Sequence, residues 1–356
     1  MMARKKILLI YPGYLFPLIM ASQHRVIDML KTLTLHHEVH FMSFVRNMDD
    51  KIDTINKMSE ICKNYCPIEP RNYESSFIKR KVIGIKAYLS FILEGRSLRH
   101  YYTSNKFILD QIKSYFSLHD FDVIQIEYWY CADIFKNLNV GTLKVLDSHG
   151  ILHQKKRKEY NKLYNMNASY FKKRELHNYR QSEIEAINNA DLFISISEID
   201  NHYIKKNFEK KDSLIIQTGQ DLSKFENYRL KKSGDTILFY GGMESKQNYF
   251  AVKRFVDKIL PKIKIKLPKV KCRIVGNNPP PEIKLMHNGH DFIVEGFVSD
   301  VRIPLSKCTV MILPLEIGAG FRSRIVEVMA LGIPVVGTHN ALDNVGLVNG
   351  KHCYVS

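Results

Sequence analysis

The sequence predicts an α/β protein with two parallel sheets, and three observations support this prediction. Short apolar segments of strand length, such as Lys6–Tyr11 and Glu38–Phe44, alternate with longer segments of helical pattern. Buried strands joined by helices form parallel sheets with helices on both faces. The alternation restarts after the polar segment Glu226–Asp235, and a chain of 356 residues exceeds one ordinary core. We therefore expect two domains, residues 1–228 and 229–356.

The same two patterns predict the remaining elements. Further strands are expected at Phe121–Glu127, Leu143–Leu146, Ala190–Ser197, Leu214–Gln217, Thr236–Tyr240, Lys271–Val275, Phe292–Glu295, Val310–Leu315 and Pro334–Thr338. Helices are expected near 22–35, within 151–190, at Asn248–Ile265 and near 322–331. Ligands of such sheets bind at the carboxyl ends of the strands, so the sequence predicts a site in a cleft between the two sheets.

The N-terminal segment fits two interpretations. A basic start, an apolar stretch and small residues resemble a secretory signal. Alternatively, Lys6–Tyr11 is the first buried strand and Pro12-Gly13 is the turn after it. We favour the strand, because Pro12 and Pro17 would interrupt a signal helix. The sequence contains no run of about eighteen apolar residues, so we expect no membrane span.

Cysteine usage and charge narrow the class of protein. The cysteines lack zinc-site spacing and predict reduced thiols in a cytoplasmic protein. They are Cys62, Cys66, Cys131, Cys272, Cys308 and Cys353. The formal net charge of +17 is spread over both halves. Nucleic acid, anionic lipid or phosphorylated substrates would each explain it, as would a low-GC genome.

A glycine-rich break near the C-terminus, "TVMILPLEIGAGFRSRIVEVMALGIPVVGT", is a candidate anion site. A buried strand ends at Gly318-Ala319-Gly320, and a helical pattern follows. Glycines permit close approach to a ligand, and a helix start presents free N–H groups to a phosphate. Arg322 and Arg324 can add charge-assisted hydrogen bonds, while Glu327 suits the hydroxyls of an attached sugar. The alternative is an ordinary surface Arg324–Glu327 pair.

Two further strands end at glycine. In "ILFYGGMESKQNYFAV", Gly241 and Gly242 end the strand and Asn248 can cap the next helix. Lys246 either reaches an anion or is solvated. In "CRIVGNNPPPEI", Gly276 takes the same place.

Together these motifs resemble the family-4 type of retaining, nucleotide-sugar-dependent glycosyltransferases with the GT-B fold, in which two Rossmann-like domains face each other. The matching strings include "GGMESKQNYFAVKRF", "RIVGNNPPPEI", "VEGFVSDVR" and "GAGFRSRIVEVMALGIPVV". "EIEAINNADLFISISEID" and "TGQDLSKF" resemble the link into the second domain. The resemblance covers about 180–350 well and the first 150 residues more loosely. Family members continue through further helices beyond the position of Ser356, so we expect a second domain cut short at this end.

The resemblance implies transfer of a sugar from a nucleoside-diphosphate sugar, with retention and without a metal or other cofactor. Glu327 matches the carboxylate that binds the donor ribose. Arg322, Arg324 and the backbone of Gly318, Ala319 and Gly320 match the segment that holds the diphosphate and sugar. The glycine breaks at Gly241, Gly242 and Gly276, with Lys246, complete the expected donor site.

In the first domain, His149 in "LDSHG" matches a histidine that faces the transferred sugar, although a satisfied core histidine is the alternative. Gly13 matches a loop near the diphosphate or acceptor. His149, Arg322 and Glu327 are therefore the expected catalytic residues. Fixed cations would stabilise the charge that develops on the departing phosphate.

The sequence also departs from the family pattern. The family has an acid eight residues before the ribose-binding glutamate, where this chain has Ala319, and Glu316 lies three residues earlier. Gly242 replaces an arginine, and Lys246 is one residue from the customary lysine. Phosphate binding is therefore expected to depend more on Arg322 and Arg324.

The segment Phe77–Tyr102 interleaves lysines and arginines with apolar residues. It fits either a basic amphipathic surface on anionic lipid or an ordinary helix with a solvated face. Lys155–Lys158 and Lys172–Arg174 are similarly basic. A glycan or lipid-linked acceptor at the inner face of the plasma membrane fits the charge. A nucleic-acid groove is disfavoured because no recognition module is visible.

The leading hypothesis is thus a hexosyltransferase of bacterial surface polysaccharide biosynthesis. An NAD-dependent sugar dehydrogenase or epimerase is disfavoured, because the first turn lacks the GxGxxG pattern. A catalytically lapsed GT-B scaffold or binding protein remains an alternative, since the expected acid is absent.

Overall fold

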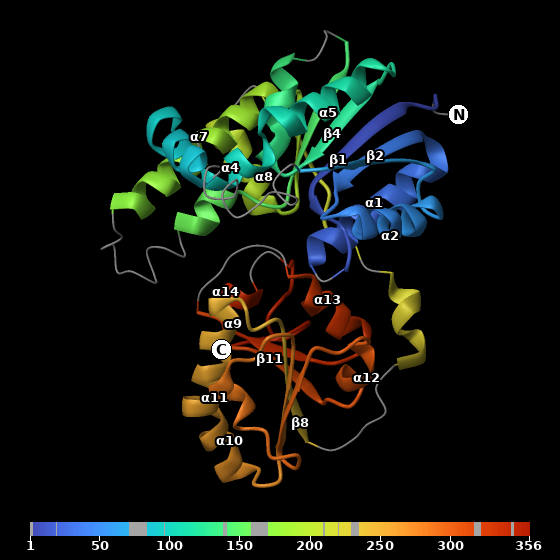
Figure 1. Cartoon of the computed structure of the whole chain (residues 1–356). Helices are drawn as coiled ribbons and strands as arrows, with labels where there is room; N and C mark the ends of the chain where they lie inside the picture. The colour runs from blue at the N-terminus through green and yellow to red at the C-terminus, as the bar shows by residue number, and fades with distance from the viewer. Residues whose placement is uncertain are drawn as a thin grey trace. The chain divides into compact units, whose positions relative to one another are not determined.

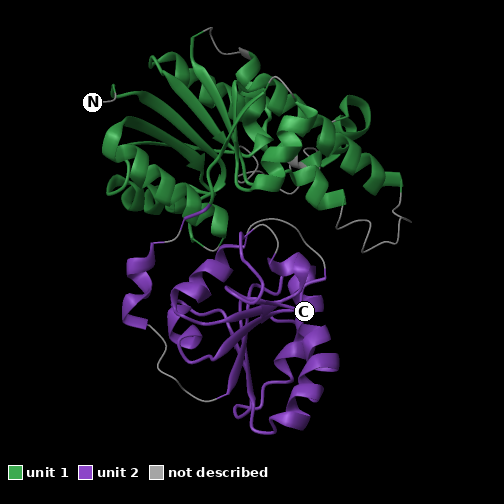
Figure 2. Ribbon diagram, turned by 180° about the vertical axis from the view of Figure 1, so that it is seen from behind, with its two compact units in different colours: residues 1–217 green, residues 218–356 purple. Residues whose placement is uncertain are grey.

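The computed structural model describes residues 3–18, 20–70, 84–95, 97–137, 141–157, 170–208, 211–219, 221–228, 235–316, 322–342 and 345–356. The chain divides into two compact units, Met1–Gln217 and Thr218–Ser356 (Figure 2). This division precedes the 228/229 boundary expected from the sequence. The short helix η4 (Leu222–Tyr228) belongs to the second unit because Phe225 is buried in that unit's core and the Tyr228 hydroxyl donates to Asp300 at 3.3 Å.

The first unit contains a parallel sheet whose described strands are in the order β3-β2-β1-β4-β5-β6-β7. Their bounds are Lys6–Tyr14 (β1), Glu38–Phe44 (β2), Asn64–Ile68 (β3), Val123–Glu127 (β4), Leu143–Ser148 (β5), Leu192–Ser195 (β6) and Asp212–Ile215 (β7). The strand order reverses between the neighbours β1 and β4. Ligands bind at such a switch point, outside the carboxyl ends of the strands.

Helices and short helical turns follow these strands. They are α1 (Ala21–His36), α2 (Met48–Ser59), η2 (Ser90–Glu94), α4 (Leu98–Thr103), α5 (Lys106–Ser117), η3 (Trp129–Asn137), α7 (Tyr170–Asn189) and α8 (Glu198–Asn207). Alternate residues of β1 enter different clusters: Leu8 and Ile10 pack with α5, whereas Leu9 packs with Val26 and Leu30 of α1. The sheet is therefore buried on both faces, as its uniformly apolar strands predict.

The second unit contains a parallel sheet in the order β10-β9-β8-β11-β12-β13. Its strands are Thr236–Tyr240 (β8), Lys271–Val275 (β9), Phe292–Gly296 (β10), Val310–Leu313 (β11), Val335–Gly337 (β12) and Tyr354–Val355 (β13). Its helices are α9 (Lys246–Arg254), η5 (Phe255–Ile259), α10 (Leu260–Lys266), α11 (Pro281–Lys284), α12 (Arg302–Leu305), α13 (Ser323–Ala330) and α14 (His339–Leu342). Figure 1 shows α9, α10 and α11 on one side of β8 and β11, with α12 and α13 on the other.

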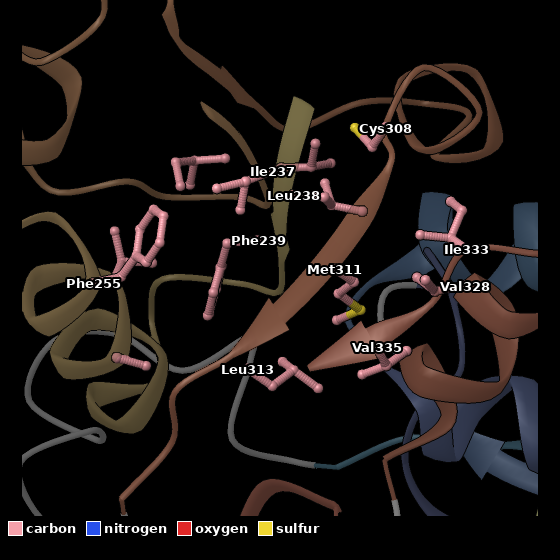
Figure 3. Packing of buried hydrophobic residues seen from close by; sticks show 14 of the residues in the cluster. Ile237, Leu238, Phe239, Phe255, Cys308, Met311, Leu313, Val328, Ile333 and Val335 are labelled. Atoms are coloured by element: carbon pink, nitrogen blue, oxygen red, sulfur yellow. The ribbon is translucent and has the colours of Figure 1, made fainter. Parts of the chain in front are cut away.

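The core of this unit lies between the sheet and its helices. Figure 3 shows Phe239 of β8 and Phe255 of η5 on one side, and Met311, Val335 and Val328 on another. All five side chains are buried. The switch point of this sheet lies between β8 and β11, which pair directly.

Several predicted elements are confirmed with the same bounds, namely β2, β8 and β9. The prediction that Pro12-Gly13 forms a turn is wrong: β1 continues to Tyr14, with a register shift between Tyr11 and Tyr14 that accommodates Pro12. β3 was not expected from the sequence, and it contains Pro67. Proline is tolerated there because β3 lies at the sheet edge.

The helices α2, α5 and α8 were also not expected from the sequence. All six cysteines are free thiols. Within the described ranges, none of the helices combines the length and apolar character needed to cross a membrane.

Candidate functional site

Three glycines meet where β8 and β9 of the second unit end. The Gly241 N–H donates to the Val275 carbonyl at 2.8 Å, at the start of the turn that leaves β8. A Cβ on Gly276 would overlap the Gly241 carbonyl, and one on Gly241 would overlap the Arg324 guanidinium. Gly276 also has a φ of +152°, which residues with a side chain rarely adopt. The glycines expected from the sequence are therefore required by close packing at this edge.

Arg324 of α13 holds this turn. Its Nη1 donates to the Tyr240 carbonyl at 2.8 Å and its Nη2 to Asn248 Oδ1 at 3.0 Å, while Asn248 Nδ2 donates to the Gly242 carbonyl at 2.7 Å. Arg324 Nε is inaccessible to solvent and has no hydrogen-bond partner among the residues that the structure describes. Burial, with the charge of nearby Arg322, lowers the pKa of Arg324 to about 10. Arg324 thus clamps the glycine turn, and it is not a member of an ordinary surface ion pair.

Asn248 has a different role from the one expected. The residue that precedes α9 is Ser245, so Asn248 lies inside the helix and does not cap it. Its amide instead bridges the Gly242 carbonyl and Arg324. Lys246, the first residue of α9, is exposed.

Glu327 lies in the second turn of α13 and is half-buried. The Tyr240 hydroxyl donates to its Oε2 at 3.1 Å. Burial raises the pKa of the Tyr240 hydroxyl, and the adjacent Glu327 charge raises it further, so the phenol stays a donor. The carboxylate is therefore held beside the end of β8, next to the glycine turn.

Of the remaining predicted residues of this unit, some are described by the structure and others are not. Arg322 Nη1 donates to the carbonyls of Asn340 (3.1 Å) and Ala341 (3.2 Å) in α14. Glu316 Oε1 forms an ion pair with Arg254 Nη1 at 2.8 Å. The segment Gly318-Ala319-Gly320 lies outside the residues that the structure describes.

A buried group of charged side chains lies at the carboxyl ends of β4 and β5 in the first unit. His149 Nε2 is 2.7 Å from Glu127 Oε2, and Arg25 Nη2 donates to Asp147 Oδ2 at 2.7 Å. Gln125 Nε2 donates to the other oxygen of Glu127 at 2.9 Å. Glu127 and Asp147 are partners in the register of β4 and β5, and both are fully buried. His149 and Arg25 are only 8% and 6% exposed.

Burial dominates the titration of this group. It raises the pKa of Glu127 to about 7 and that of Asp147 to about 6, and it lowers the pKa of His149 to about 4. The Arg25 charge opposes both carboxylate shifts. At neutral pH His149 is therefore uncharged, and Glu127 is close to its point of half-protonation.

Aromatic packing fixes the ring of His149. Tyr128 has a φ of +64° and stacks on His149, with ring centroids 4.2 Å apart and planes inclined by 18°. Lys155 Nζ donates to the His149 carbonyl at 2.7 Å. The Nε2 atom of His149 is therefore satisfied, as expected for a core histidine. The residue nevertheless lies just past β5, at the edge of the sheet where ligands bind.

Gly13 lies within β1 and not in a loop after it. A Cβ there would be 3.1 Å from the Tyr11 ring. Sequence reasoning missed Arg25, Glu127 and Asp147. One signal could have found the two acids: each stands at or near the end of a predicted buried strand, where a carboxylate needs a partner.

Glu127, Asp147 and His149 also form a set whose ligand atoms lie within 4.8 Å of one another. Such a set could hold a metal ion. The guanidinium of Arg25 is already paired with Asp147 and supplies positive charge to the two carboxylates. A guanidinium thus already takes the place of a cation beside Asp147, and the residues present fit a metal ion poorly.

The described part of the basic segment exposes apolar side chains. Over residues 84–94 the buried positions include Ala87 and Phe91. The exposed ones are Ile85, Tyr88, Leu89, Ile92 and Leu93. Tyr88 lies 6.3 Å from the ring of Phe171, which is also exposed, at the start of α7. The cations expected at 79–81 and at Arg96 lie outside the residues that the structure describes.

Comparison with known proteins adds to this geometry. Residues 234–355 match the family described as "Glycosyl transferases group 1". A search of curated proteins finds no match to the chain. Solved structures similar to it include sucrose-phosphate synthase (tll1590) from Thermosynechococcus elongatus, with 15% identity and a TM-score of 0.70 over 99% of this chain and 86% of that one.

Two further structures extend the comparison. Anabaena Alr3699/HepE, in complex with UDP and glucose, has 14% identity and a TM-score of 0.60 over 99% of this chain and 86% of its own. TarM has 11% identity and a TM-score of 0.65 over 100% and 89%. These likenesses show the fold, two parallel-sheet α/β units of the GT-B type. The family match lies within the second unit, so the comparisons show the GT-B fold for the whole chain and a likeness to group 1 glycosyl transferases for residues 234–355.

Proposed function

We propose that the protein transfers a hexose from a nucleoside-diphosphate sugar to a glycan or lipid-linked acceptor, with retention of anomeric configuration. One observation carries this proposal: a clamped glycine turn and a tyrosine-held carboxylate lie together at the switch point of the second sheet. Anabaena HepE is bound to UDP and to UDP-glucose in its structures, which supports a nucleotide donor.

The diphosphate would be bound by backbone N–H groups and positive charge near the glycine turn. Arg324 is held by neutral oxygens, so its positive charge is not cancelled by its hydrogen-bond partners. Arg322 immediately precedes α13, and its guanidinium donates to the Asn340 and Ala341 carbonyls of α14, which are also neutral. Preorganised cations and helix-end N–H groups stabilise a leaving phosphate more strongly as its charge develops.

Glu327 would accept hydrogen bonds from the donor ribose. An ionised carboxylate accepts only, and the Tyr240 hydroxyl fixes one of its oxygens. Hydrogen bonds to a charged group contribute about 1.5–3 kcal/mol each, enough to select a nucleotide that carries both ribose hydroxyls.

In the first unit, His149 would accept a hydrogen bond from a hydroxyl of the transferred sugar. It is neutral at physiological pH because burial lowers its pKa to about 4. We propose that no metal takes part, because the Arg324 guanidinium supplies positive charge beside the glycine turn. Chelation with EDTA would then leave turnover unchanged.

The acceptor would be met at an anionic membrane surface, as in bacterial surface polysaccharide assembly. The exposed apolar face of 85–93 lies beside the aromatic start of α7, where Lys172, Lys173 and Arg174 follow. Apolar side chains flanked by cations favour the interface of anionic lipid. Vesicles containing phosphatidylglycerol should bind the protein in flotation, and Leu89→Ser with Leu93→Ser should weaken binding. Equal binding to neutral vesicles would contradict an electrostatic contribution.

The donor assignment is tested by nucleotide binding. In calorimetry or thermal-shift titrations with uridine, guanosine and adenosine diphosphates, one nucleotide should bind, and Glu327→Gln should weaken its binding by about 10- to 100-fold. Arg322→Ala should reduce transfer from the matching sugar nucleotide. Glu282→Gln is the matched control, because Glu282 accepts a tyrosine hydroxyl in the same unit, from Tyr249 at 2.6 Å.

Three outcomes separate the alternatives. Anomeric NMR of the product should show the configuration of the donor retained. Binding without hydrolysis or transfer would favour the lapsed scaffold. A protein that binds no nucleotide, and in which Glu327→Gln behaves like Glu282→Gln, would overturn the proposed function.

A further inference from the structure

We infer that Glu127 is a positioning residue that fixes the tautomer of His149, with the Arg25–Asp147 pair holding Glu127 in place. The catalytic consequence of this inference rests on the proposed function, while the tautomer itself does not. The four side chains come from three elements and the segment after β5: Arg25 from α1, Glu127 from the end of β4, and Asp147 from β5 beside His149.

The hydrogen bonds determine which atoms can carry a proton. Gln125 donates to Oε1 of Glu127, and an amide N–H requires an acceptor there. Any proton on the Glu127 carboxyl must therefore be on Oε2, the oxygen that faces His149 Nε2 at 2.7 Å. Glu127 Oε2 and His149 Nε2 are thus joined by one hydrogen bond, which contains a single proton. When Glu127 is ionised the proton is on Nε2, and Nδ1 keeps its lone pair.

The surroundings restrict other arrangements. Tyr128 covers one face of the His149 ring, and Lys155 holds the His149 carbonyl. Asp147 adjoins Glu127 across the register and would repel it, but Arg25 binds Asp147 at 2.7 Å and its charge acts on both carboxylates. Among the residues that the structure describes, the charged and titratable groups that face the pair include Arg25, Asp147, Lys155 and the Tyr128 phenol.

This arrangement gives the pair a defined chemical role. An imidazole whose Nε2–H is held by a carboxylate presents Nδ1 as an acceptor, which suits a hydroxyl of the sugar. A second partner that fixes ring orientation and tautomer is typical of functional histidines. Glu127 would then act on the reaction through His149 without contacting the substrate.

Nitrogen NMR of the full chain tests the tautomer directly. The chain has 14 histidines, so the resonances of His149 in ¹⁵N-histidine-labelled protein are assigned by their loss in His149→Gln. At about pH 8, above the ordinary histidine range, wild type should show the proton on Nε2. In Glu127→Gln, Gln125 still needs an acceptor, so the new amide N–H₂ must face His149. The proton should then move to Nδ1.

Activity provides the second measurement. Glu127→Gln should lower kcat by about 10- to 100-fold, with little change in KM for the donor, because nucleotide binding belongs to the second unit. The matched control is Asp133→Asn, since Asp133 Oδ2 lies 2.6 Å from Nε2 of another buried histidine, His100. That variant should change the resonances of His100 and leave those of His149 and kcat unchanged.

An Nδ1–H tautomer of His149 in the wild-type protein would overturn the inference, and this measurement needs no variant to fold. Unchanged His149 resonances in a folded Glu127→Gln would overturn it as well. So would a shift of these resonances on adding equimolar Zn²⁺ or Mn²⁺, which would make the group a metal site. If the tautomer changes as expected but the wild-type protein transfers no sugar, the proposed function is wrong, while the inference that Glu127 fixes the tautomer of His149 is confirmed.

Discussion

Each unit places an arginine near the switch point of its sheet, and the two arginines have hydrogen-bond partners of different charge. Arg25 is paired with the carboxylate of Asp147, beside a second buried carboxylate, Glu127. Arg324 donates to neutral oxygens, the Tyr240 carbonyl and the Asn248 amide. The first guanidinium is paired with a charged group, whereas the hydrogen-bond partners of the second carry no charge.

This difference indicates how a shared architecture can serve separate tasks. A guanidinium paired with a carboxylate loses most of its field at a distance, so Arg25 organises its neighbours. A guanidinium held by carbonyl and amide oxygens keeps more of its field, although the Glu327 charge acts on Arg324, and this suits a turn that receives a diphosphate. At this edge the first unit is thus stabilised by the Arg25–Asp147 ion pair. The second unit is stabilised by close packing of the glycine backbone around the Arg324 guanidinium.

Removal of Arg25 should have the largest effect. Arg25→Met leaves the fully buried Asp147 unpaired, which should cost about 3–5 kcal/mol in the free energy of unfolding. Urea unfolding followed by the fluorescence of Trp129, the single tryptophan and a buried residue of the first unit, measures this. The loss should shrink at acid pH, where Asp147 accepts a proton. A pH-independent loss would mean that packing, and not charge, dominates.

The pH dependence of stability sharpens the role of Glu127. Burial raises its pKa from 4.5 to about 7, so the folded chain binds this proton more tightly than the unfolded chain does. The resulting stabilisation is complete below about pH 4.5 and is lost as the pH rises through about 7. Wild type should therefore gain up to about 3 kcal/mol relative to Glu127→Gln between about pH 7.5 and 4.5. Parallel stability profiles would contradict the raised pKa.

In the second unit the expected penalty is steric. Gly276→Ala places a Cβ against the Gly241 carbonyl at a φ of +152°, and overpacking with this strain should cost about 3 kcal/mol. Gly332→Ala is the matched control, because Gly332 also has a positive φ, +78°, but open space around its Cβ. That change should cost only about 1 kcal/mol. Amide hydrogen exchange in β8 and β9 separates this unit's stability from that of the first.

Removal of Arg324 should have the smallest effect on stability. Arg324→Met leaves two neutral acceptors without a donor, for a loss of about 1–2 kcal/mol, well below that of Arg25→Met. Nucleotide binding should nevertheless weaken, because the retained charge is gone. Hydrogen exchange and nucleotide titration on the same protein measure both effects. Equal losses in the free energy of unfolding for Arg25→Met and Arg324→Met would contradict the proposed difference between the two arginines.

The sequence predicted the fold because its signals are local. A few neighbouring residues are enough to recognise an apolar strand such as β2 or β8, or a strand-end glycine such as Gly241 or Gly276. Where a local signal was misleading, the sheet decided the outcome. Pro67 reads as a break, yet it lies in an edge strand that does not need its N–H, and Gly13 reads as a turn although β1 continues past it.

The sequence by itself determined two parallel α/β units, the glycine turns at the strand ends and a carboxylate, Glu327, one turn into the helix that follows. The tertiary structure alone decided the partners of the buried charges. Arg25 and Asp147 are 122 positions apart, and Arg324 and Tyr240 are 84 apart. No local pattern specifies such contacts, because a buried guanidinium can satisfy its donors with any acceptor that folding brings within reach.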